Sequence, residues 1–235
     1  MEGDILSLLA GSNPKQAQDF ILAFGEHRAA SWADSHRQAA TRSASQKHVP
    51  PFRGQLRHQL GETALSNAAQ VARAGCIPIT TVKPGGVFMV ARIGRFGLVS
   101  LSISGRRSMP RRSPTRRLLG EPNEDLDPQQ KLWLAEKVSS RGATELSYFG
   151  CMIACPSRRD PTAPAEMVLA VPNARLNEWL GWIPLTRAYA LLQDLIVNDD
   201  VFKNISQPKP IPDRRLPTFR LPKRDLEAGE EGSSD

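Results

Sequence analysis

The chain has 235 residues, of which 40% are hydrophobic, and a formal net charge of +7 at pH 7. This length allows one sizeable core with appended segments, and no apolar run is long enough to cross a bilayer. The first ten residues carry Glu2 and Asp4 where a secretory signal carries positive charge. Together with an odd number of cysteines, three, this predicts a cytoplasmic protein with reduced thiols.

Charge is distributed unevenly along the sequence. Residues 51–120 contain twelve Lys and Arg against a single acid, Glu62, whereas residues 121–200 contain seven against twelve. A basic section beside an acidic one could bind an anionic partner, or the two could complement each other within the chain. The sequence leaves both arrangements open.

Residues 1–48 are predicted to form a helical extension. The triplet Ser-Asn-Pro at 12–14 is a typical helix start, and an apolar stripe of helical period follows over 17–24. The apolar pattern thins after Gly25, so we expect the far end of this helix to be solvated or frayed. The extension could pack on the main domain or on a second copy of the chain.

A core domain is predicted over residues 49–205. It opens with a helix over about 53–74, where apolar residues share one stripe and Gly75 provides a stop. The hydrophobic period then changes to two, which is typical of strands. The predicted strands are 77–81, 87–91 and 98–104.

The last of these strands alternates most clearly. Val99, Leu101 and Ile103 share one side, and the serines within 100–104 share the other. This pattern predicts an antiparallel hairpin with one apolar face and one wet face.

The second half of the core repeats the order of helix and hairpin. A helix is expected between Pro128 and Gly142, followed by a strand over 145–155 that is apolar on both faces, as in the centre of a sheet. A partner strand is expected at 166–171, with helical pieces around 176–180 and 185–197.

The predicted fold class is therefore α+β. It comprises a mostly antiparallel sheet built from two helix–hairpin units, with helices packed against it. Residues 206–235 are rich in proline and then acidic, and we expect them to form a disordered tail.

The familiar catalytic and metal-binding motifs are missing from the sequence. It has no Cys-x-x-Cys, His-x-x-x-His or Gly-x-Ser-x-Gly, and no phosphate-binding glycine loop. We therefore expect neither metal nor cofactor, and a role without catalysis. The enzymatic alternative is a hydrolase or nuclease that would use Glu145, Asp160 and Glu166.

The most distinctive stretch is 106–117, which contains three arginine pairs spaced five residues apart. Six guanidinium groups in twelve residues cannot be buried without partners, so the stretch should lie at the surface or against an anion. Arginine forks bind phosphate, and the prolines between them favour an extended path. The stretch could instead dock on the acidic residues 121–127 or on an acidic protein, or be a solvated loop.

We therefore expect a binding protein that contacts nucleic acid or another polyanion through residues 92–117, with no membrane partner. The serines within 100–104 could add hydroxyl contacts, and Phe96 could be exposed to stack on a base, whereas Trp179 and Trp182 are expected to pack in helices. The alternative is a protein–protein interaction module or homodimer that docks through its N-terminal helix and its tail. The predicted nucleic-acid-binding residues are Arg92, Arg95, Arg106, Arg107, Arg111, Arg112, Arg116 and Arg117.

Overall fold

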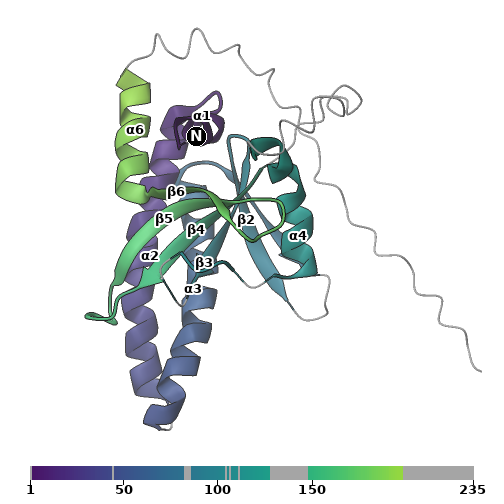
Figure 1. Cartoon of the computed structure of the whole chain (residues 1–235). Helices are drawn as coiled ribbons and strands as arrows, with labels where there is room; N and C mark the ends of the chain where they lie inside the picture. The colour runs from purple at the N-terminus through teal and green to yellow at the C-terminus, as the bar shows by residue number, and fades with distance from the viewer. Residues whose placement is uncertain are drawn as a thin grey trace, which may run out of the picture.

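Helices pack against a mostly antiparallel sheet in this protein, so the α+β class is confirmed (Figure 1). The predicted helix at 128–142, Glu145 and the predicted tail at 206–235 lie outside the residues that the structure describes. This computed structural model describes residues 2–43, 45–81, 86–103, 105, 107–110, 112–127 and 148–197. Within those ranges, no helix is both long and apolar enough to cross a membrane.

Three helices open the chain: α1 (Glu2–Ala10), α2 (Pro14–Arg42) and α3 (Val49–Val71), with the short helix η1 (Gln46–His48) before α3. The start of α2 lies where the sequence predicts it, because the Asn13 side chain accepts a hydrogen bond from the Gln16 N–H. The helices α2 and α3 form a hairpin whose far end projects beyond the sheet (Figure 1).

The far end of α2 was expected to be solvated or frayed; it is not frayed, although its last turn, residues 40–42, is exposed. This helix continues to Arg42 because its second half packs along α3. Small side chains make that close packing, and Ser31, Ser35 and Ala39 are all buried. A count of large apolar residues does not detect an interface built in this way.

Six strands form the sheet of the described residues, and they follow one another in chain order across it. All neighbours are antiparallel except β3 and β4, which are parallel. Two three-stranded antiparallel units are therefore joined through one parallel pair. The strands are β1 (Gly75–Thr80), β2 (Val87–Ile93), β3 (Phe96–Ser102), β4 (Tyr148–Pro156), β5 (Pro164–Pro172) and β6 (Trp179–Pro184).

A parallel pair requires a crossover, because the chain must return from the end of one strand to the start of the next. Between β3 and β4 this path includes α4 (Pro114–Gly120) and η2 (Glu121–Leu126). The predicted arginine stretch therefore becomes part of the crossover. Ser113 caps α4 by accepting a hydrogen bond from the Arg116 N–H.

The helices α1, α2 and α3, together with α6 (Leu185–Val197), cover one face of the sheet. Their core includes Leu6, Phe20 and Phe24 from the helices, packed with Leu98 and Met152 from the sheet. The opposite face has a second apolar cluster beside α4. The N-terminal helices thus pack on their own chain's sheet, one of the two expected arrangements, while the domain boundary after residue 48 stays a prediction.

The expected wet face of β3 is wrong for Ser100 but holds at the end of the strand, where Ser102 is exposed. Ser100 is only 3% exposed because the serine side of the strand faces α3, and Ser102 accepts a hydrogen bond from Arg28. Phe96 is also buried, 1% exposed, and its ring packs against Tyr148 with centroids 5.7 Å apart. Neither Ser100 nor Phe96 is placed to contact a nucleic acid.

Residues 176–180 are not helical, because β6 begins at Trp179 and continues the sheet beside β5. Trp179 and Trp182 therefore pack edge to face on a strand, with ring centroids 5.5 Å apart. By contrast, β4 is buried over almost its whole length, as expected for a central strand. The helix predicted at 185–197 is α6.

A fully buried arginine, Arg28, joins α2 to α3 and to β3. Its guanidinium donates hydrogen bonds to the Arg57 carbonyl at 2.7 Å and to the Ser102 hydroxyl at 2.6 Å. Gly61 makes room for this group, since a Cβ there would lie 2.7 Å from Arg28 Nη1 and 2.8 Å from Ser100 Oγ.

We predict that Gly61→Ala destabilises the protein by about 1–3 kcal/mol, because the added methyl displaces a buried, hydrogen-bonded guanidinium. The matched control is Gly54→Ala in the same helix, where a Cβ meets nothing within 4 Å. That control should gain up to about 1 kcal/mol from helix propensity. Urea unfolding measures both, and equal stability of the two variants would contradict this role of Gly61.

Candidate nucleic-acid interface and an adjoining cavity

The structure divides the predicted arginines between two ends of the sheet. Arg92 and Arg95 lie where β3 begins. The guanidinium carbon of Arg95 is 5.1 Å from the ring centroid of Tyr148. Arg107 and Arg112 follow the opposite end of β3. A seven-residue strand spans about 20 Å, so these pairs do not form one compact patch. Two further predicted residues, Arg106 and Arg111, lie outside the described residues.

The described part of the arginine stretch is held by contacts with β6 and the loop before it. The guanidinium of Arg107 lies 5.9 Å from the Trp182 ring centroid, and its carbonyl accepts a hydrogen bond from Trp179 Nε1 at 3.1 Å. Arg112 Nε donates to the Leu176 carbonyl at 3.5 Å. Arg107, Arg112 and Arg117 nevertheless remain exposed at the surface. We refer to these three residues as the crossover arginines.

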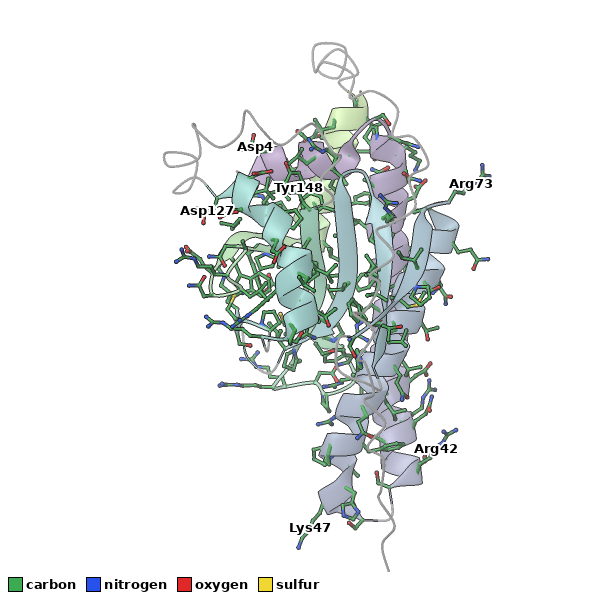
Figure 2. The ribbon with its side chains drawn as sticks, turned by 90° about the vertical axis from the view of Figure 1, so that its right-hand side faces the viewer. Asp4, Arg42, Lys47, Arg73, Asp127 and Tyr148 are labelled. Carbon is green, nitrogen blue, oxygen red and sulfur yellow. The ribbon has the colours of Figure 1, made fainter. Side chains whose placement is uncertain are left out.

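A second basic surface was missed by the sequence analysis. Residues 35–61 contain five Lys and Arg and no acid, and they fold into the far ends of α2 and α3. Figure 2 shows Arg42 and Lys47 at the end of this hairpin, remote from the sheet. The first part of this stretch lies before residue 51, where the acids of α1 and early α2 balance its charge. We refer to Arg37, Arg42, Lys47 and Arg53 as the hairpin tip, of which Arg37 is ion-paired with Asp34 one turn before it.

The crossover begins at the end of the sheet nearest the hairpin. Because β3 and β4 are parallel, Ser102 pairs with Ala154, and the crossover and the β4–β5 loop leave the sheet at the same end. That loop lies against α3, where Arg57 Nη2 donates to the Pro161 carbonyl at 2.8 Å. The same loop exposes Arg158 and Arg159. Basic side chains from three separate segments therefore gather toward one end of the molecule.

Acidic side chains gather at the other end. The helix η2 carries three acids, and Asp127 follows it, while α1 carries Glu2 and Asp4 in its first turn. Figure 2 shows Asp4 and Asp127 at the end opposite Arg42 and Lys47. That end also carries Arg73, Arg92 and Arg95, and Glu2 is ion-paired with Arg187, so its charges are mixed in sign, whereas the hairpin end is mainly basic.

A cavity of about 430 Å³ lies where β2 separates from β3. The two strands pair only through Ala91–Ile93 and Phe96–Leu98, so the first half of β2 diverges from the second half of β3. Helix α3 closes the gap from one side and α4 from the other. The lining includes apolar Val87, Phe88, Val99, Leu101 and Phe149, together with polar His58, Glu62, Ser100, Arg112, Thr115 and Arg116.

Glu62 is the acid of this cavity, and its side chain is 14% exposed. One carboxylate oxygen, Oε2, accepts a hydrogen bond from the Met89 N–H of β2. The other, Oε1, lies 3.9 Å from His58 Nδ1 and has no hydrogen-bond partner among the described residues. Burial raises the pKa of Glu62, and the Met89 bond and the charges of Arg28 and Arg116 oppose that rise. The result is a fixed carboxylate with one unused acceptor.

The three carboxylates of the enzymatic alternative are not seen together. Asp160 lies in the exposed β4–β5 loop, where the hydroxyl and N–H of Thr162 bind its carboxylate and lower its pKa. Glu166 is on β5 opposite Cys155, and Glu145 lies outside the described residues. Across the described part of the chain, no group of three or more His, Cys, Asp or Glu could hold a metal ion.

The thiols offer no reactive nucleophile among the described residues. Cys151 and Cys155 are both buried in β4, and Cys76 is partly exposed, but burial raises its pKa as well. Burial raises the pKa of Cys151 to about 12, so this thiol stays protonated near neutral pH.

We predict that His58 makes stability depend on pH. Its side chain is 57% exposed, but partial burial, and then the charges of Arg116 and Arg28, lower its pKa in the folded protein, so the effect should be modest. Below about pH 6.5 the unfolded chain therefore binds a proton that the folded chain does not. The free energy of unfolding should decrease as the pH is lowered through this range. His58→Gln should reduce this loss between pH 7.5 and 5.5, as measured by urea midpoints. The control His27→Gln removes a histidine away from the cavity, and equal pH dependence in both variants would contradict the prediction.

Comparisons with known proteins identify no relative from which a function could be transferred: no family model, curated protein or solved structure matches the chain. The function is therefore inferred from the arrangement of these charges and of the cavity.

Proposed function

We propose that this protein binds nucleic acid, or a similar polyanion, through the hairpin tip and the crossover arginines, without catalysing a reaction. The observation that carries the proposal is the sign of the exposed charge. Residues 35–120 contain fifteen Lys and Arg and one acid, and that acid, Glu62, is withdrawn into the cavity. We also propose that the protein acts in the cytoplasm, given its three free thiols.

The type of side chain supports phosphate as the ligand. Arginine presents a planar fork of donors that matches two phosphate oxygens, and each contact releases counterions from the nucleic acid. Arg107 is steadied by Trp182, so less side-chain freedom is lost when it binds. These contacts position a strand but read no sequence.

The distribution of apolar side chains disfavours a protein partner. The core of a protein interface is usually a contiguous apolar patch with aromatic anchors. The exposed large apolar residues of the described chain are instead spread over five elements, one each on α2, α3, β2, α4 and α6. They are Leu22, Val71, Val87, Leu118 and Val197.

We predict that binding to a mixed-sequence duplex weakens steeply as salt rises. Each phosphate contact contributes about 0.9 log unit of affinity per log unit of salt on duplex DNA. The double variant Arg42→Gln/Lys47→Gln should therefore lower the slope by up to about 1.8, and a triple variant of the crossover arginines by up to about 2.7. Fluorescence anisotropy across a salt series, on the duplex and on a single strand, measures these slopes.

The matched control is Lys15→Gln/Arg73→Gln, which also removes two charges but at the opposite end of the α2–α3 hairpin. Gln16 donates to the carbonyls of Ala72 and Arg73, so both control positions lie at that end. The control should keep the slope of the unmodified protein. Equal slopes for the tip variant and the control would contradict the proposal.

A further inference from the structure

The cavity between β2 and β3 has no part in the surface contacts proposed above. It interrupts an otherwise continuous sheet and holds a carboxylate away from water, and both features cost stability unless a ligand uses them. Its lining includes exposed side chains, Val87 at 60% and Arg112, so it opens at the surface. Arg112, one of the crossover arginines, lines the cavity together with Arg116 of α4. The cavity therefore adjoins the proposed phosphate-binding surface.

We propose that this cavity binds a nucleobase, guanine in preference, with the attached phosphate held by Arg112 and Arg116. The inference rests on the proposed function and deepens it. The shared chemistry is a base joined to a phosphate, which either a free mononucleotide or an unpaired nucleotide of a bound strand can supply.

The size and walls of the cavity suit a flat aromatic ring. Its volume of about 430 Å³ falls in the range of small-molecule sites, which combine apolar walls with a few placed polar groups. Phe88 is half-buried on β2, and Val99 and Leu101 face the cavity from β3. A base inserted between the strands would pack against these side chains, and its faces would be removed from contact with water.

Glu62 supplies the selectivity. The Met89 N–H fixes one carboxylate oxygen, while the other is buried without a hydrogen-bond partner among the described residues, and a donor on a ligand that reaches it would satisfy it. An ionised carboxylate only accepts hydrogen bonds, and guanine presents two adjacent N–H donors on its pairing edge. Uracil presents one N–H between two carbonyl oxygens, and the negative carboxylate repels those two oxygens. Adenine and cytosine, with one amino group each, should fall between them.

The two arginines account for the phosphate. Arg112 is exposed, while Arg116 is half-buried and close enough to Glu62 and His58 to influence the pKa of both. A phosphate beside α4 would meet both guanidinium groups, each able to donate two parallel hydrogen bonds.

Calorimetric titration with GMP, AMP, CMP and UMP tests this assignment. GMP should bind most tightly and UMP most weakly, and Glu62→Gln should reduce the preference for GMP over UMP by at least about tenfold. The matched control Glu166→Gln changes a half-buried glutamate of β5 and should leave the preference intact. Equal affinity for GMP and UMP, or competition by inorganic phosphate as effective as that by GMP, would overturn the assignment.

A second variant guards against a folding defect in Glu62→Gln. Val87→Trp adds bulk at an exposed position on the cavity mouth and should abolish GMP binding while preserving the circular dichroism spectrum. GMP binding that survives this variant in a folded protein would place the nucleotide elsewhere.

The outcomes distinguish failure of the cavity assignment from failure of the proposed polyanion binding. If GMP does not bind but duplex binding keeps its salt dependence, the cavity assignment fails and the proposed function stands. If GMP binds through Glu62 and no polyanion binds, the proposed function fails instead. An oligonucleotide with one unpaired guanine should compete with GMP if strands supply the base, whereas competition by free GTP alone would identify mononucleotides as the source.

Discussion

The parallel pairing of β3 and β4 determines where the arginine stretch lies. A turn suffices for each antiparallel neighbour, but this pair forces the chain to return along the sheet through α4 and η2. Asn123 fixes that path because it is fully buried and bonds three backbone groups. Its amide nitrogen donates to the carbonyls of Phe149 at 2.8 Å and Pro172 at 2.6 Å, and its oxygen accepts from the Phe149 N–H at 2.8 Å. The arginines are therefore carried on an anchored segment beside the cavity.

The hairpin tip depends on a different interaction, the buried Arg28 at the base of the projecting helices. Burial lowers the pKa of Arg28 to about 10, and the charge of Arg57 adds to that effect while Glu62 opposes it. The guanidinium of Arg57 lies 3.7 Å from the Trp32 ring centroid, so two arginines and one indole connect α2 with α3. With its base held in this way, the hairpin carries a run of basic side chains beyond the sheet, and its own Asp34 pairs with Arg37.

The sequence predicted the fold class, the start of α2, the central strand β4 and helix α6, because caps and hydrophobic period act locally. It did not predict β6, where a short apolar run containing Trp179 and Trp182 fits a helix or a strand equally well. Phe96 was expected in an exposed turn, but the turn is short and this residue already belongs to β3. The exposed arginines of the crossover were predicted. The cavity was not, because it arises where β2 leaves β3, and no single segment encodes that divergence.

The central claim is that a polyanion binds at the hairpin tip, and lysine acetylation footprinting tests it most directly. Lys47 lies at the tip, whereas Lys15 begins α2 at the opposite end of the hairpin and is paired with Asp19 at 2.5 Å. A bound duplex should protect Lys47 from acetylation and leave the reactivity of Lys15 unchanged, with protection lost at high salt. Equal reactivity of Lys47 with and without the duplex, under conditions where binding is saturated, would contradict the account.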